Sequence, residues 1–283
     1  MVRTVWLASY PKFGNTWLRI FLANLLHPQQ APVDLNDLPE PTPIAASRGH
    51  FDDLLGVPAA LLTQAEIDRL RPAADIELAR TWDAPRLLRK AHDGYRTLPD
   101  GRPLLGEGPE FAAIYLLRAP WDVAVSMTNH FDCTLEQTVA NLCDPAFAVA
   151  QSRQGLSGQL RQDLGTWEAH ATGWLQAPLP LCLLRYEAMQ ATPLTEFRRA
   201  VRVLGLPHDD AAIAAALEAS RFERLQRQEA AQRFRETPHH ATAFFRRGQV
   251  GEGLACLTEA QREPLVAMHR RVQALIGERG LLA

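Results

Sequence analysis

Apolar residues along this chain occur with two different spacings, and the change between them predicts strands followed by helices. Residues 5–8 form a short continuous apolar run, which is typical of a buried strand. From Asn15 onward, the apolar positions 18, 21, 22 and 25 recur at the spacing of one helix face. Pro11 and Gly14 interrupt the apolar pattern between these segments. The first part of the chain is therefore predicted to be a strand, a tight turn and a helix.

The rest of the chain repeats this alternation. Further apolar runs predict buried strands over residues 86–90, 113–118 and 181–185. An N-capping pair, Thr63 and Glu66, and the first-turn residue Pro120 mark two helix starts. Helices are predicted over residues 63–70, 120–131, 160–175, 193–204, 209–219 and 259–276, with a short one near residues 52–55. This order favours an α/β fold of one domain, residues 1–283, with a central parallel sheet flanked by helices on both faces.

The turn after the first strand has the layout of an anion-binding loop. The first backbone N–H groups of a helix have no partner within it, and the helix dipole adds partial positive charge there. Lys12 adds a full positive charge where a phosphate or sulfate would lie. The layout is that of a P-loop, although the sequence G-x-x-x-x-G-K-[ST] is absent. The alternative interpretation is an ordinary strand–turn–helix with a surface lysine.

Composition narrows the class of protein. With 283 residues, of which 47% are hydrophobic, the chain can bury a large core. A formal net charge of −2 gives no overall field that would recruit nucleic acid or an anionic membrane. Positive charge is instead local, because seven arginines lie between residues 221 and 247. Such a run forms either a solvated helix surface or part of an anion site.

The four cysteines and the lengths of the apolar segments indicate the cellular compartment in which we expect the protein. The cysteines are scattered, without a C-x-x-C pair or zinc spacing, and no carboxylate cluster suggests a metal site. The simplest interpretation is a reducing, cytoplasmic setting. No segment approaches 18 continuous apolar residues, and the start of the chain has no signal-peptide pattern, so we expect no membrane span.

Lysine is rare, which draws attention to the two lysines that occur. The chain has 28 arginines but only Lys12 and Lys90. A lysine ammonium can lie against a single oxygen and can lose its proton, which a planar guanidinium does less well. Both lysines are therefore candidates for functions that arginine would not perform.

Side chains suited to anion chemistry follow the ends of the predicted strands. Lys12 follows the first strand, Lys90 and His92 end the second, Arg118 ends the third, and Tyr186 follows the fourth. In parallel sheets, ligands bind at the carboxyl ends of the strands. A histidine beside a lysine is a candidate general base, and an arginine there can donate two hydrogen bonds to a phosphate. We expect these side chains to share one edge of the sheet.

Taken in order, these segments resemble the sulfotransferases that use 3′-phosphoadenosine 5′-phosphosulfate (PAPS). Residues 10–17 resemble the family's YPKSGTTW loop, residues 90–92 its K-T-H segment, and residues 118–126 its R-x-P-x-D-V-A-V-S segment. Residues 186–189 resemble Y-E-D-M, residues 220–222 resemble T-S-F, and residues 245–251 resemble F-x-R-K-G-x-x-G. The resemblance covers about residues 5–258, nearly the whole chain.

The resemblance implies sulfuryl transfer from PAPS to a hydroxyl or amine of a small-molecule, natural-product or glycan acceptor, with the bisphosphate PAP as product. It implies His92 as the general base, Lys12 stabilising the leaving phosphate, and Lys90 as an auxiliary catalytic residue. It implies no metal, because fixed cations take that place. The cofactor-binding residues that it implies are Lys12, Phe13, Gly14, Asn15, Thr16, Trp17, Arg118, Ser126, Tyr186, Ser220, Phe222, Arg246, Arg247 and Gly248.

Several positions depart from the family pattern. Phe13 and Asn15 replace a serine and a threonine in the loop, and Arg247 stands where lysine is frequent. The family's late dimerisation pattern is degraded at Leu254 and Glu259, so the oligomeric state stays open. Two alternatives to sulfuryl transfer also stay open. A P-loop kinase would bind ATP with Mg²⁺ better than PAPS, and a non-catalytic nucleotide-binding module would bind the cofactor without turnover.

The acceptor pocket is the least determined part of the prediction. Residues 27–58 and 129–158, both predicted to be mostly irregular, are expected to build it. The aromatic candidates for an apolar lining are Phe51, Trp82, Phe131 and Phe147.

Overall fold

A four-stranded parallel sheet organises the molecule. The computed structural model describes residues 4–38, 44–106, 108–151, 157–206 and 209–281. The strand order is β2 (Leu87–Ala91), β1 (Thr4–Ser9), β3 (Phe111–Leu117) and β6 (Leu181–Arg185). All neighbouring pairs in this sheet are parallel, so the four carboxyl ends lie at one edge. β1 and β3 are buried along their whole lengths, as their continuous apolar sequences predict.

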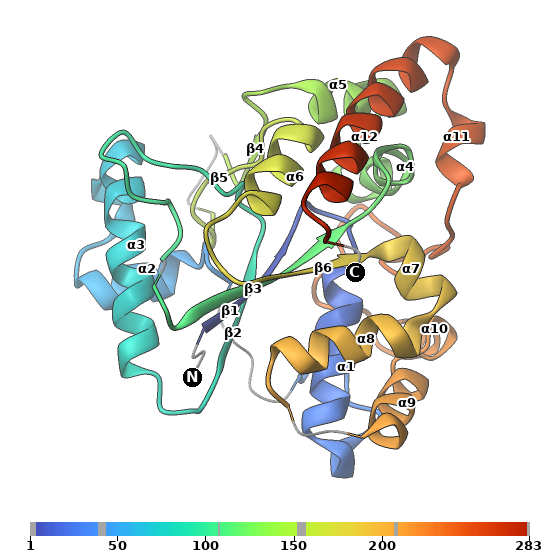
Figure 1. Ribbon diagram of the computed structural model, residues 1–283, viewed down its shortest axis with the longest axis horizontal. Helices are drawn as coiled ribbons and strands as arrows, with labels where there is room; N and C mark the ends of the chain where they lie inside the picture. The colour runs from blue at the N-terminus through green and yellow to red at the C-terminus, as the bar shows by residue number, and fades with distance from the viewer. Residues whose placement is uncertain (1–3, 39–43, 107, 152–156, 207–208, 282–283) are drawn as a thin grey trace.

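Helices cover both faces of the sheet (Figure 1). On one face α1 (Asn15–Leu26) packs with α8 (Pro193–Val203) and α9 (Asp210–Ala219). On the other lie α4 (Pro120–Phe131), α5 (Leu135–Cys143), α6 (Trp167–Leu175) and α12 (Glu259–Glu278). The remaining helices are α2 (Arg48–Leu55), α3 (Gln64–Thr81), α7 (Tyr186–Ala191), α10 (Phe222–Ala231) and α11 (Glu252–Cys256), with 3-10 turns at Pro28–Gln30 and Ala59–Leu61. The predicted α/β class with a parallel sheet between helices is confirmed.

Local sequence signals placed several helix ends correctly. The Thr63 hydroxyl accepts a hydrogen bond from the backbone N–H of Glu66, and the Glu66 carboxylate accepts one from the N–H of Thr63, which completes the predicted capping box. Pro120 is the first residue of α4. α3 nevertheless runs to Thr81, eleven residues beyond the predicted end at residue 70, with Pro72 inside it.

The prediction of a helix over residues 160–175 was wrong in its first half. Gln162–Asp163 form a short strand, β5, that pairs with β4 (Ala148–Val149) in an antiparallel ladder. Gly165 then takes a positive φ of 62°, which stops regular structure, and the Thr166 hydroxyl caps a new helix at the N–H of Ala169. Residues 129–158, predicted to be irregular, contain α5 and β4, although residues 152–156 lie outside the described part of the chain.

Candidate active site

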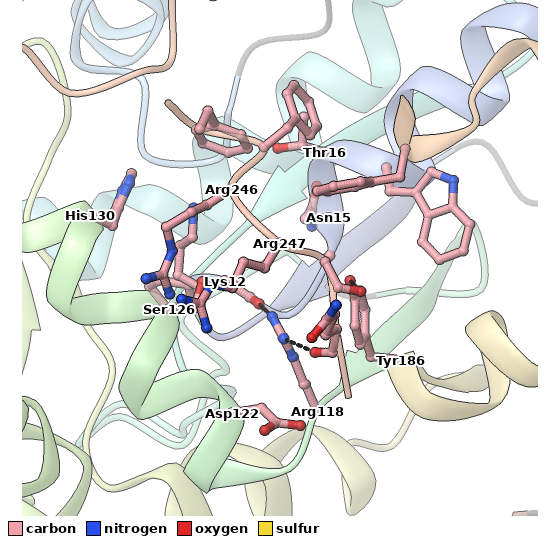
Figure 2. A pocket seen from close by; sticks show the side chains of 18 of the residues that line it. Lys12, Asn15, Thr16, Arg118, Asp122, Ser126, His130, Tyr186, Arg246 and Arg247 are labelled. Carbon is pink, nitrogen blue, oxygen red and sulfur yellow. Dashed lines mark hydrogen bonds between the residues drawn. The ribbon is translucent and has the colours of Figure 1, made fainter. Parts of the chain in front are cut away.

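One cleft opens at the carboxyl edge of the sheet and collects residues from widely separated parts of the chain. Figure 2 shows Lys12, Arg118 and Arg246 approaching one another there, from the loop after β1, the end of β3 and the loop before α11. Most of the residues that the sequence assigns to the site line this cleft: Lys12, Gly14, Asn15, Thr16, Trp17, Lys90, His92, Arg118, Ser126, Tyr186, Phe222, Arg246, Arg247 and Gly248.

The loop between β1 and α1 has the backbone of an anion site. Lys12 and Gly14 have positive φ angles of 71° and 104°, so the chain reverses sharply before the helix. Leu18 is the first residue whose N–H bonds back to Gly14, at 3.2 Å, which leaves the earlier helix N–H groups without an intrahelical acceptor. A side chain at position 14 would place Cβ 2.8 Å from the Tyr186 ring, so this position requires glycine for space as well as for conformation.

Lys12 carries its charge into the cleft under an aromatic ring. Its Nζ lies 3.8 Å from the centroid of the Phe244 ring. Burial lowers the pKa of Lys12 to about 7, and the nearby positive charges of Lys90 and Arg118 act in the same direction. Near neutral pH this amine therefore gains or loses a proton readily, and an anion beside it would favour the charged form.

His92 is held in a single tautomer. Its Nδ1 lies 2.7 Å from the backbone oxygen of Ser9. A carbonyl oxygen only accepts, so Nδ1 carries the hydrogen and Nε2 keeps its lone pair. Burial and the charge of Lys90 lower the pKa of His92 well below its ordinary value, so the ring is neutral at neutral pH. A neutral imidazole with a free Nε2 lone pair has the form that a general base requires.

The segment around His92 is fixed by buried partners. His170 donates from Nε2 to the His92 backbone oxygen at 3.1 Å, and the Tyr115 hydroxyl lies 3.0 Å from the other nitrogen of His170. The next residue, Asp93, receives two hydrogen bonds of 2.7 Å from Arg71, and both side chains are almost inaccessible to solvent. This bidentate pair attaches the end of β2 to α3.

Lys90 has a carboxylate partner that the sequence analysis did not select. Its Nζ lies 3.4 Å from Glu236, whose other oxygen receives a 2.7 Å hydrogen bond from Arg19 on α1. Burial raises the pKa of Glu236, but Lys90 and Arg19 lower it more, to about 2, so the carboxylate is ionised at neutral pH. Glu236 lies within the arginine-rich segment 221–247, and no local pattern distinguishes it from the other acidic residues there.

At the other end of the cleft, Arg118 joins two loops. It donates 3.2 Å and 3.0 Å hydrogen bonds to the backbone oxygens of Lys12 and Gln249, and its guanidinium lies 4.2 Å from the Tyr186 ring centroid. Its Nε is buried and has no hydrogen-bond partner in the part of the chain that the structure describes. Arg246 donates to the backbone oxygen of Val125 at 3.3 Å, so it lies beside α4. The two guanidiniums add further positive charge to the cleft that holds Lys12.

The loop that carries Arg246 is held in place by two carboxylates. Asp122 on α4 accepts 2.8 Å hydrogen bonds from the N–H groups of Gly251 and Gly253. Glu229 on α10 accepts from the N–H groups of Phe244 at 2.6 Å and Phe245 at 2.9 Å. These hydrogen bonds pair the backbone N–H groups of the loop and hold it over the cleft.

Two residues assigned to cofactor binding do not line the cleft. The Phe13 side chain is fully buried, with its ring stacked 5.7 Å from that of Tyr10, because an aromatic side chain at this turn finds more apolar contact in the core. The Ser220 hydroxyl donates to the backbone oxygen of Ala216 at 2.8 Å, at the end of α9. Phe13 can therefore act in the loop only through its backbone, and cofactor binding by Phe13 and Ser220 stays a prediction.

The aromatic residues considered for the acceptor pocket do not line this cleft, and their place at an acceptor stays a prediction. Phe51 packs between α2 and α3, Trp82 donates to the backbone oxygen of Arg86 before β2, and Phe147 stacks on Tyr10. Phe131 packs against the main core. The cleft instead contains Phe244 and His130, and within the described ranges the buried Nδ1 of His130 has no hydrogen-bond partner. Burial lowers the pKa of His130 to about 3, and Lys12 and Lys90 contribute to that decrease.

Within the described ranges, His, Cys, Asp and Glu side chains form no group of three or more that could hold a metal ion. In that same part of the chain, no helix combines the length and the apolar character needed to cross a membrane.

Comparison with known proteins identifies one family. The sequence model of the family called sulfotransferase domain matches residues 3–275 of this chain. Cytosolic sulfotransferase 14 of Arabidopsis thaliana is 25% identical over 273 residues, which cover 93% of this chain and 72% of that protein. Cytosolic sulfotransferase 15 of the same plant is 26% identical over 275 residues, covering 93% and 69%.

Two solved structures share the fold. Mouse sulfotransferase SULT7A1 complexed with PAP superposes with a TM-score of 0.58 at 16% identity, covering 98% of this chain and 89% of that one. Retinol dehydratase in complex with androsterone and inactive cofactor PAP gives a TM-score of 0.62 at 18% identity, covering 96% and 81%.

Proposed function

Because this chain belongs to the sulfotransferase domain family and is a PAPS-dependent sulfotransferase, we propose that it transfers the sulfuryl group to a hydroxyl or amine of a small-molecule acceptor, with His92 as general base. The family match decides against the P-loop kinase and the non-catalytic module as alternatives. The observation that supports the proposed base most directly is the tautomer of His92, whose Nε2 lone pair is available beside Lys12 and Lys90.

The cations of the cleft suit a donor such as PAPS, which carries negative charge at two positions. The phosphosulfate would lie at the helix N–H groups of the Lys12 loop, and the 3′-phosphate at Arg118, Ser126 and Arg246. Gly248, Arg247, Tyr186 and Phe222 line the remaining wall, with Trp17 beside Tyr186.

The proposed reaction is an in-line displacement at sulfur. The acceptor oxygen or nitrogen forms a bond to sulfur while the bond between sulfur and the bridging phosphate oxygen breaks. The acceptor proton passes to Nε2 of His92, and the electron pair of the broken bond leaves with PAP. Lys12 stabilises negative charge on the leaving oxygen, and Lys90 orients the sulfuryl oxygens.

Glu236 and His92 lie near the lysines in the cleft. These polar groups favour an acceptor molecule whose reacting end is polar. We also propose a cytoplasmic location, which agrees with the names of the curated relatives.

The proposal is tested with PAPS labelled in its sulfuryl group and incubated with a small-molecule extract of the source. We expect labelled products with the unaltered protein, and His92→Ala should lower turnover by about 10²–10⁴-fold, the range for loss of a general base. Affinity of His92→Ala for PAP, measured by calorimetry, should change little because the base does not touch the product. His27→Ala, at the far end of α1, is the matched control and should retain turnover.

Two results would contradict the proposal. One is full turnover by His92→Ala. The other is an equal loss of turnover and PAP affinity, which would indicate that His92 binds the nucleotide instead of removing a proton.

A further inference from the structure

Asn15, which replaces the family's threonine in the loop, directs its side chain toward the sheet. Its Nδ2 lies 2.7 Å from the backbone oxygen of Leu7 and 3.1 Å from Oγ of Ser9. Because a carbonyl oxygen only accepts, the atom near Leu7 must be the amide nitrogen, which sets the orientation of the whole amide. Both hydrogens of that nitrogen are then used at the end of β1.

This orientation leaves Asn15 unsuited to hold a phosphate. The remaining polar atom of its side chain, Oδ1, is buried and has no hydrogen-bond partner among the described residues. It can only accept hydrogen bonds, and an ionised phosphate can also only accept. A side-chain contact between Asn15 and PAPS would therefore require the two bonds to β1 to break. The backbone N–H of Asn15 still belongs to the free amides of the helix start.

Asn15 and His92 both contact Ser9, through its hydroxyl and chiefly its backbone oxygen, respectively. Nδ1 of His92 donates to the Ser9 backbone oxygen at 2.7 Å and lies 3.3 Å from the Ser9 hydroxyl. Ser9 is fully buried, so water does not substitute for these contacts. The Ser9 hydroxyl accepts a hydrogen bond from Asn15 and also faces the His92 ring, so Ser9 links these two side chains.

We propose that Asn15 is a positioning residue for the general base, which fixes Ser9 at the end of β1 and so holds His92 with Nε2 directed into the cleft. This inference rests on the proposed function of His92. The tautomer of an imidazole is set by the hydrogen bond that its other nitrogen makes, so a displaced Ser9 would allow the ring to rotate or to exchange tautomers.

The test compares Asn15→Leu, which keeps the approximate size but has no donor, with Asn24→Leu in the same helix. Asn24 is also buried and hydrogen-bonded, to Ile20 and Val33, but lies away from the cleft. We expect turnover of Asn15→Leu at saturating PAPS to fall by about 10- to 100-fold, the range for loss of a partner that orients a functional histidine. Its affinity for PAP should stay within about twofold, and turnover of Asn24→Leu should be nearly unchanged.

A second readout separates this inference from the proposed function. Nitrogen-15 NMR of the imidazole rings, with His92→Ala used to assign the signal, reports the tautomer without any turnover. We expect the unaltered protein and Asn24→Leu to show only the Nδ1–H form, and Asn15→Leu to show a mixture. If no acceptor is sulfated but Asn15→Leu alters the tautomer, the proposed function fails and the positioning role stands.

Three results would overturn the positioning role. They are an unchanged His92 tautomer, unchanged turnover, or a loss of PAP affinity that accounts for the lost turnover, which would make Asn15 a cofactor ligand. If Asn15→Leu does not fold, Asn15→Thr, whose hydroxyl keeps one donor, is measured in the same way and should give an intermediate effect on turnover and tautomer.

Discussion

Affinity for PAP should decrease above about pH 7, because Lys12 loses its proton in the empty cleft. Burial and neighbouring cations lower the pKa of Lys12 to about 7 in the ligand-free protein. A bound phosphate next to the amine favours the charged form, so its pKa in the complex returns toward the ordinary value of about 10.4. Binding at alkaline pH therefore requires the uptake of a proton.

The size of the effect follows from these two pKa values. Below about pH 7 Lys12 is already protonated, so its contribution to affinity is constant. Between about pH 7 and pH 9 the dissociation constant should rise about 50-fold, which is about 2.3 kcal/mol, because Lys12 is already half deprotonated at pH 7. Over this range a phosphate whose second pKa is about 6 is already fully ionised, so titration of the ligand adds little.

Calorimetry in two buffers of different ionisation enthalpy measures this directly. At pH 8 the difference in observed enthalpy should correspond to uptake of about 0.9 proton per PAP, the deprotonated fraction of a group with a pKa of about 7. Lys12→Arg is the control, because a guanidinium stays charged throughout this range and should remove most of the uptake. Burial also lowers the pKa of Lys90, so Lys90 accounts for any proton uptake that remains in Lys12→Arg at higher pH. A dissociation constant that does not change from pH 7 to pH 9, or equal proton uptake in Lys12→Arg, would refute the reasoning.

Three further substitutions probe other contacts. Arg118→Ala should weaken PAP binding by about 10- to 100-fold, as expected for loss of charged hydrogen bonds, and should affect turnover at saturating PAPS less. Unchanged PAP affinity in calorimetry would show that this arginine does not bind the 3′-phosphate. Glu236→Gln removes the counter-ion of Lys90, so the pKa of that lysine should fall further. The decline of turnover at alkaline pH should then shift to lower pH. An identical pH–rate profile would show that Glu236 does not keep Lys90 charged. Asp93→Ala leaves a buried guanidinium of α3 unpaired and should lower the free energy of unfolding by about 3–5 kcal/mol. Glu77→Ala, at an exposed ion pair, is the control and should leave the free energy of unfolding nearly unchanged in the same denaturant titration.

Local patterns predicted the elements whose signals lie close together in the chain. The apolar run of β1, the turn with Lys12 and Gly14, and the helical spacing from Asn15 lie within about 25 residues, and the structure has all three in order. Where an element depends on a distant partner, local patterns failed. β5 is a strand because it pairs with β4, and the apolar residues near 160 carry no sign of that pairing.

Spacing and composition were enough to predict the four strands of the main sheet, most of the helices packed on it and the kinds of charged side chain at the strand ends, since they govern local conformation. The use made of each polar atom depended on the folded structure. Both hydrogens of the Asn15 amide bond to β1, and Glu236 reaches Lys90 across 146 positions of the chain. Such contacts depend on which donors and acceptors remain unpaired once the core has packed, and this is a property of the whole fold.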